Sequence, residues 1–227
     1  VLSSSNLMPV KEGRYTSLLI CLLVTMVGLP LLEDLSVGRI LLGIWFLVTS
    51  VVFMASLTGR GHRNRLLFVA SGIFCVLMVG NLFMELLGWD SFGFSVVALP
   101  YGLVFLSWLT GLILSSIFKA DRVTPDLISG AVVAYLLLGI CWGGLYSLIE
   151  LIQPGSFSFS HGARDVSSLF YYSFVTLTTL GYGDILPLTK IARTTAYLEA
   201  VTGVMFTAIR VAGLVGSVRL GRVSAGE

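Results

Sequence analysis

The sequence predicts an all-α membrane protein with six transmembrane helices. The first observation is composition, because 56% of the 227 residues are hydrophobic and only 11% are charged. The second is distribution, because the charged residues gather in short segments between long apolar runs. Runs of about 20 apolar residues can cross the hydrocarbon core of a bilayer as helices. A formal net charge of +2 is too small to favour a nucleic-acid partner. The three cysteines lie inside apolar runs, without the spacing of a metal site or a disulfide framework.

Six apolar runs account for most of the chain. We expect transmembrane helices over residues 16–32, 40–57, 66–87, 91–118, 127–152 and 194–218. The fifth is expected to begin near Thr124-Pro125-Asp126, which combines a capping Thr, Pro in the first turn and an acid facing the positive helix end.

Basic residues orient these helices. Most Lys and Arg side chains fall in segments on one side of the membrane, namely Lys11, Arg14, Arg60, Arg63, Arg65, Lys119, Arg122, Arg219 and Arg222. Fewer fall on the other side. Under the positive-inside rule, the chain is a multi-pass protein of the cell membrane with both termini cytoplasmic.

A short segment between the fifth and sixth runs is expected to enter the membrane from outside and return. Residues 165–178 predict a short helix whose C-terminal, negative dipole end favours a cation. Such irregular segments are tolerated at membrane depth where they line a cavity or pack in protein.

The residues that follow are Thr179, Leu180, Gly181, Tyr182 and Gly183. Glycine tolerates left-handed backbone angles, which would let successive carbonyl groups face a pore and replace the water around a cation. The Thr179 hydroxyl can add a further oxygen. The alternative is an ordinary glycine-rich turn.

The stretch 176–184, preceded by Tyr171-Tyr172 and followed by Pro187, resembles the pore module of potassium channels. In that family an aromatic pair precedes T-x-T-T-V-G-Y-G-D, and here Leu180 replaces the usual Val. The resemblance covers residues 127–220. It implies a K+-selective filter formed by the carbonyls of residues 179–183, with K+ as the permeant ion and no organic cofactor. One such segment cannot surround an ion, so a homotetramer in the lipid bilayer is expected.

Several residues are expected to support this filter. By resemblance, Tyr171 and Tyr172 brace its width, although a plain core role is the alternative for either ring. Thr178 precedes the filter and Asp184 follows it. Some relatives carry Glu at the position of Val175, paired with the Asp after the filter. Val175 cannot make that contact, so we expect Asp184 to bind the hydroxyl of Tyr171 or Tyr172.

The sixth run contains two charged residues and a candidate hinge. Glu199 lies toward the outer side and is expected to hydrogen-bond the short helix. Gly203 is either a hinge or a point of close helix packing. Arg210 would repel cations if it faced the pore, so we expect it to point away from the axis, or to lie near an inner gate.

The predicted division is a cytoplasmic tail (1–15), a four-helix bundle (16–118), a linker (119–126), a pore domain (127–220) and a cytoplasmic tail (221–227).

Six spans with the pore in the last two match the layout of voltage-gated cation channels, whose fourth span carries regularly spaced Arg or Lys. Here that span carries none. We therefore expect a voltage-sensor-like domain without gating charges, and a voltage-insensitive channel of bacterial type. Both tails are too short to fold alone, and no feature of the sequence identifies a regulatory ligand.

Two other functions remain open from the sequence. One is a non-selective cation channel, against which the intact Gly-Tyr-Gly stands. The other is a non-conducting membrane sensor or partner protein that keeps a pore fold. No catalytic residues are expected, because no nucleophile, metal cluster or phosphate-binding loop is present in a plausible arrangement.

Overall fold

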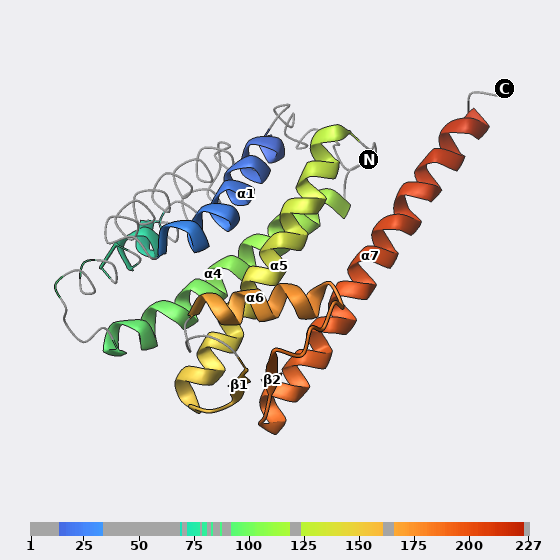
Figure 1. Ribbon diagram of the computed structural model, residues 1–227. Helices are drawn as coiled ribbons and strands as arrows, with labels where there is room; N and C mark the ends of the chain where they lie inside the picture. Colours follow the sequence, from blue (N-terminus) through green and yellow to red (C-terminus); the bar gives the residue numbers. More distant parts are fainter. Residues whose placement is uncertain are drawn as a thin grey trace, which may run out of the picture. The chain divides into compact units, whose positions relative to one another are not determined.

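The computed structural model describes residues 14–33, 92–118, 124–160 and 166–224, with scattered positions between 69 and 87. The elements in chain order are α1 (Arg14–Glu33), α4 (Phe92–Phe118), α5 (Pro125–Ile152), β1 (Phe157–Phe159), α6 (Val166–Leu177), β2 (Ile185–Pro187) and α7 (Lys190–Ser224) (Figure 1). The predominance of helix confirms the predicted all-α class in its coarse form. The expected second span and most of the third lie outside the described residues.

Two of the described helices are long and apolar enough to cross a membrane. They are residues 99–117 within α4 and the whole of α5. Helix α1 carries a shorter apolar run, Tyr15–Gly28. The bounds of α4 and α5 lie close to those predicted from the sequence.

Helix α7 begins earlier and ends later than the predicted span of 194–218. Its first turn is capped by Thr189, whose Oγ1 accepts a hydrogen bond from the backbone N–H of Ala192 at 3.3 Å. A Thr at this position satisfies an N–H group that has no partner within the helix. The apolar pattern alone could not show this, because Lys190 and Arg193 interrupt it.

The described residues group into two compact units. In the first, α1 meets the start of α5 through Asp126. Its Oδ1 accepts hydrogen bonds from the backbone N–H groups of Tyr15 at 2.9 Å and Thr16 at 3.2 Å. The Tyr15 ring packs over Gly130, where an added Cβ would lie 3.1 Å from the ring. Asp126 lies in the first turn of its own helix, as expected. It also caps α1, whose first N–H groups need acceptors.

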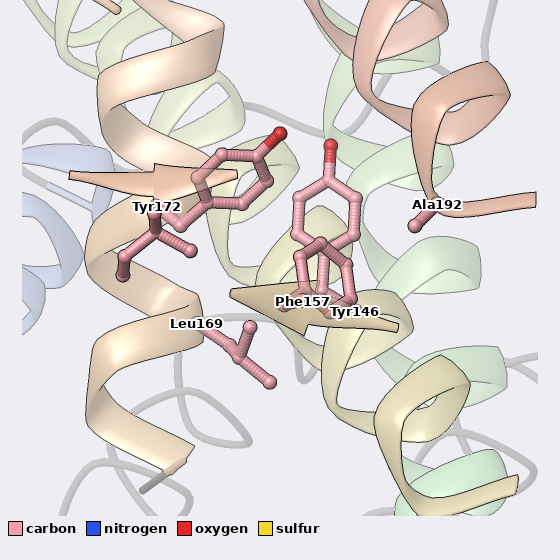
Figure 2. Packing of buried hydrophobic residues seen from close by; sticks show 6 residues of the cluster. Tyr146, Phe157, Leu169, Tyr172 and Ala192 are labelled. Atoms are coloured by element: carbon pink, nitrogen blue, oxygen red, sulfur yellow. The ribbon is translucent and has the colours of Figure 1, made fainter. Parts of the chain in front are cut away.

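The second unit contains residues 95–124 and 134–224, and its core lies where a small two-stranded sheet meets the helices. Strands β1 and β2 pair antiparallel, with Phe157 opposite Pro187 and Phe159 opposite Ile185. The aromatic cluster of this core consists of Tyr146, Phe157, Leu169, Tyr172, Ile185 and Ala192 (Figure 2). The rings of Tyr146, Phe157 and Tyr172 pack edge-on, with centroids 5.1 to 5.5 Å apart. Edge-to-face packing of this kind adds about 0.5–1.5 kcal/mol per pair beyond the burial of apolar area.

Helix α6 is seated against two glycines of α5. A Cβ added at Gly139 would lie 2.5 Å from the ring of Phe174, and one added at Gly143 would lie 2.6 Å from the ring of Phe170. Gly139 and Gly143 form a G-x-x-x-G spacing, which lets another element approach a membrane helix closely. Here the residues that fill the two gaps are aromatic side chains four apart on α6.

Candidate functional site

The turn that follows α6 has an unusual alternating backbone. Thr179 (φ 59°), Gly181 (φ 57°) and Gly183 (φ 78°) adopt left-handed angles, whereas Leu180 and Tyr182 between them do not. The left-handed angles of both glycines were predicted. That of Thr179 was not, because a β-branched residue rarely adopts a positive φ. Strain at such a position is typical of functional sites.

Hydrogen bonds to the end of α6 set the direction of this turn. The N–H of Thr179 donates to the carbonyl of Thr176 at 2.9 Å, and those of Leu180 and Gly181 donate to the carbonyl of Val175 at 2.9 and 3.3 Å. In a trans peptide the carbonyl points opposite to the N–H that follows it. The carbonyl groups of residues 178, 179 and 180 therefore all point away from α6. This is the requirement for a row of oxygen ligands along one side of the chain.

Asp184 anchors the outer end of the turn. Its Oδ2 accepts a hydrogen bond from the Tyr171 hydroxyl at 2.9 Å, and its Oδ1 accepts one from the N–H of Ile185 at 3.1 Å. The backbone carbonyl of Asp184 accepts from the N–H of Ser160 at 2.9 Å. The predicted partnership of Asp184 with one of the two tyrosines is thus confirmed for Tyr171. Tyr172 instead packs in the aromatic cluster, so the two adjacent rings have different surroundings.

The inner end of the turn is held at Leu177, the last residue of α6. Its carbonyl oxygen accepts a hydrogen bond from the Tyr135 hydroxyl of α5 at 3.3 Å. Helix α7 crosses the same carbonyl at Gly203, where an added Cβ would lie far inside van der Waals contact of the Leu177 oxygen. Close packing, one of the two alternatives for Gly203, is therefore present. The hinge role stays a prediction.

Glu199 lies buried behind α6, with 0% of its surface exposed. Its Oε2 accepts a hydrogen bond from the Tyr146 hydroxyl of α5, and its Oε1 lies 2.5 Å from Oγ of Ser173 on α6. The expected hydrogen bond between Glu199 and the short helix is present. The same Ser173 Oγ lies 2.7 Å from the carbonyl oxygen of Gly139. The carboxyl group of Glu199 on α7 thus contacts Tyr146 of α5 and Ser173 of α6, and Ser173 in turn contacts the backbone of α5.

Arg210 lies 11 residues further along α7. Its guanidinium stands 5.6 Å from the centroid of the Phe206 ring, a distance at which a cation is attracted to an aromatic face. The Phe206 ring in turn lies 5.3 Å from that of Tyr135. The Arg210 side chain is thus partly engaged with α7 itself, and its orientation relative to a pore axis stays a prediction.

Several residues of this site were missed by sequence reasoning. They are Tyr135 and Tyr146, which bind Leu177 and Glu199, together with Ser173 and the glycines 139 and 143. The G-x-x-x-G spacing on α5 was the signal that could have been used. No sequence signal pointed to the hydroxyl groups of Tyr135, Tyr146 and Ser173. Which side chains meet across three helices depends on how each helix is rotated about its axis.

The turn is exposed in the single chain. Residues 178–183 are all exposed, with Leu180 at 56% and Tyr182 at 66%. Within the part of the chain that the structure describes, no three His, Cys, Asp or Glu side chains gather to hold a metal ion.

A long helix (α5), a short helix (α6), a turn with one-sided carbonyls and a second long helix (α7) follow one another along the chain. Residues 132–218 match the family described as ion channel. The chain is similar to the Voltage-gated potassium channel Kch of Escherichia coli (strain K12), with 29% identity over 160 residues, or 64% of this chain and 36% of that protein. It is also similar to the Two pore potassium channel c of Oryza sativa subsp. japonica, with 35% identity over 86 residues, or 37% of this chain and 17% of that protein. No solved structure matches the chain.

These matches confirm the predicted resemblance to potassium channels. The chain spans little more than a third of the first relative and about a sixth of the second, as the covered shares of 36% and 17% show.

Proposed function

We propose that this chain is one subunit of a homotetrameric channel that passes K+ down its gradient. The observation that carries the proposal is the turn after α6, where the N–H groups of residues 179–181 bond to α6 and the carbonyls of residues 178–180 point the other way. Oxygen ligands arranged in this way can replace the hydration shell of a cation. The filter ligands are the carbonyls of Thr179, Leu180, Gly181 and Tyr182, with Gly183 closing the outer end.

Geometry and exposure support the proposed tetramer. One turn presents its carbonyls on one side only, so several copies around an axis are needed to surround an ion. The exposed fractions of Leu180 and Tyr182 support this, because neighbouring subunits would cover both side chains. Exposed apolar side chains on α7, namely Val201, Val204, Met205 and Ile209, fit an inner-helix face that meets a cavity, a neighbour or lipid.

Six spans with both termini cytoplasmic complete the proposal. Residues 16–118 form a voltage-sensor-like domain, residues 119–126 a linker and residues 127–220 the pore domain, between the tails 1–15 and 221–227. Helix α4 carries no Arg or Lys along its 27 residues. Because a voltage sensor moves charge through the membrane field, this channel opens without steep dependence on voltage.

The test is a reversal-potential measurement on purified protein in planar bilayers, with KCl on one side and NaCl on the other. A K+-selective channel reverses close to the K+ equilibrium potential. A reversal potential near zero would mean a non-selective cation channel, and no current at any voltage would mean a non-conducting protein. The mass of the purified particle, measured by light scattering with detergent subtracted, must equal four chains.

A further inference from the structure

The buried carboxyl of Glu199 has hydroxyl groups as its partners among the described residues. Tyr146 binds Oε2 and Ser173 binds Oε1, and neither partner carries a positive charge. An ionised carboxylate buried without a cationic partner is costly, because burial removes the water that stabilises its charge. The surroundings therefore favour the neutral acid.

The hydrogen count at Ser173 gives a second, independent argument. Its Oγ lies 2.7 Å from the Gly139 carbonyl oxygen and 2.5 Å from Oε1 of Glu199. A serine hydroxyl has one hydrogen to donate, and a backbone carbonyl oxygen can only accept. If Glu199 were ionised, one of these two short oxygen pairs would have no hydrogen between its atoms. Two acceptors at such a distance repel each other.

A proton on Oε1 removes the conflict. Tyr146 then donates to Oε2, Glu199 donates from Oε1 to Ser173, and Ser173 donates to the carbonyl of Gly139. Three donors match three acceptors. We propose that Glu199 is a neutral carboxylic acid whose proton links α7 through Ser173 to α5, and that it is a positioning residue for the filter.

The link to the filter runs through α6. Ser173 stands directly before Phe174 and two residues before Val175, whose carbonyls accept the N–H groups of Thr178, Leu180 and Gly181. Fixing Ser173 between Gly139 and Glu199 fixes the rotation of α6, and with it the direction of the acceptors that hold the filter. This second half of the inference rests on the proposed function, whereas the protonation of Glu199 does not.

The first test is infrared spectroscopy of the purified full chain at pH 7. Wild-type protein is compared with E199Q and with E150Q as a matched control. Glu150 accepts hydrogen bonds from the backbone N–H groups of Gly155 at 2.8 Å and Phe157 at 3.2 Å, so it needs no proton. We expect the carbonyl-stretch band of a protonated carboxyl group to weaken in E199Q and to stay unchanged in E150Q. An unchanged band in E199Q would overturn the protonation.

The second test is K+ flux into liposomes. E199Q keeps the pattern of hydrogen bonds, because its amide donates to Ser173 and accepts from Tyr146, and its flux should equal that of wild-type protein. E199L and S173A each break the link and should lose at least about tenfold in flux, which corresponds to 1.4 kcal/mol. Loss of flux in E199Q would mean that a charged carboxylate is required.

Wild-type flux in both E199L and S173A would overturn the positioning role. S173A, the smaller change, decides the matter if E199L does not assemble. If wild-type protein itself carries no K+ flux, the proposed function and the positioning role fail together. The infrared comparison still decides whether Glu199 carries a proton.

Discussion

The close approach of α7 to the end of α6 makes Gly203→Ala an informative substitution. An added methyl group would overlap the backbone carbonyl oxygen of Leu177. Because that oxygen belongs to the backbone, no side-chain rotation can relieve the overlap, and the helices must separate by roughly 1 Å to restore normal contact. The carbonyl is also bound by the Tyr135 hydroxyl, so a shift there weakens that hydrogen bond as well.

The expected magnitude follows from two opposing effects. Overpacking typically costs about 1–3 kcal/mol, and the rigid backbone acceptor places this case near the upper end. Replacing a helical glycine by alanine recovers about 1 kcal/mol. A net cost of about 2 kcal/mol in the arrangement with an intact filter would reduce its population roughly 30-fold. The open probability of single channels in bilayers measures this population directly.

Gly111→Ala is the matched control. Gly111 also lies inside an apolar helix, but nothing stands within 4 Å of an added Cβ, so this variant should gain slightly in stability and conduct normally. Equal open probability and equal melting temperature in G203A and G111A would refute the idea that Gly203 keeps the filter in place.

Four other variants, the first with a matched control, test separate contacts. Gly181→Ala should lose K+ over Na+ selectivity, measured by reversal potential. Gly155→Ala should keep it, because Gly155 has a comparable positive φ of 86° outside the filter and the strain of about 1–2 kcal/mol is similar; equal selectivity in both variants would contradict the assignment of the filter. Tyr171→Phe removes the hydroxyl that binds Asp184 and should loosen the end of the turn at Asp184, seen as faster decay of sustained current, and an unchanged decay would count against this contact. Val175→Glu should change the rate of that decay by offering Asp184 a second partner, and no change in sustained current would count against the idea that Val175 makes Asp184 depend on a tyrosine. Asp126→Ala should lower thermal stability by about 0.5–2 kcal/mol through loss of the α1 cap, measured by unfolding in detergent, and an unchanged melting temperature would show that the cap contributes nothing.

Local signals allowed much of this structure to be predicted. The apolar runs predicted α4 and α5 closely because length and composition alone define such helices. Left-handed backbone angles were predicted at Gly181 and Gly183, because few residues other than glycine adopt such angles without strain. The lack of a Glu at position 175 predicted a tyrosine partner for Asp184, and Tyr171 supplies it.

What sequence reasoning missed depends on contacts between distant segments. Asp126 was assigned to its own helix, because nothing local indicates that its carboxylate reaches Tyr15 and Thr16. The left-handed Thr179 could not be predicted either, because its own side chain disfavours that angle and the bonds to α6 impose it. Ser173 and Tyr146 are ordinary hydroxyl residues until three helices bring them to Glu199.

The cap that Asp126 places on α1 also has a consequence for biosynthesis. Tyr15 and Asp126 are 111 positions apart, and ribosomes add roughly 5–20 residues per second. The beginning of α1 is therefore synthesised roughly 6–20 s before the carboxylate that completes it. During that interval the first N–H groups of α1 must donate their hydrogen bonds to water or to the proteins that insert the chain into the membrane. Helix α1 reaches its finished state only when the first turn of α5 arrives, so the two helices cannot assemble until 111 further residues have been added after Tyr15.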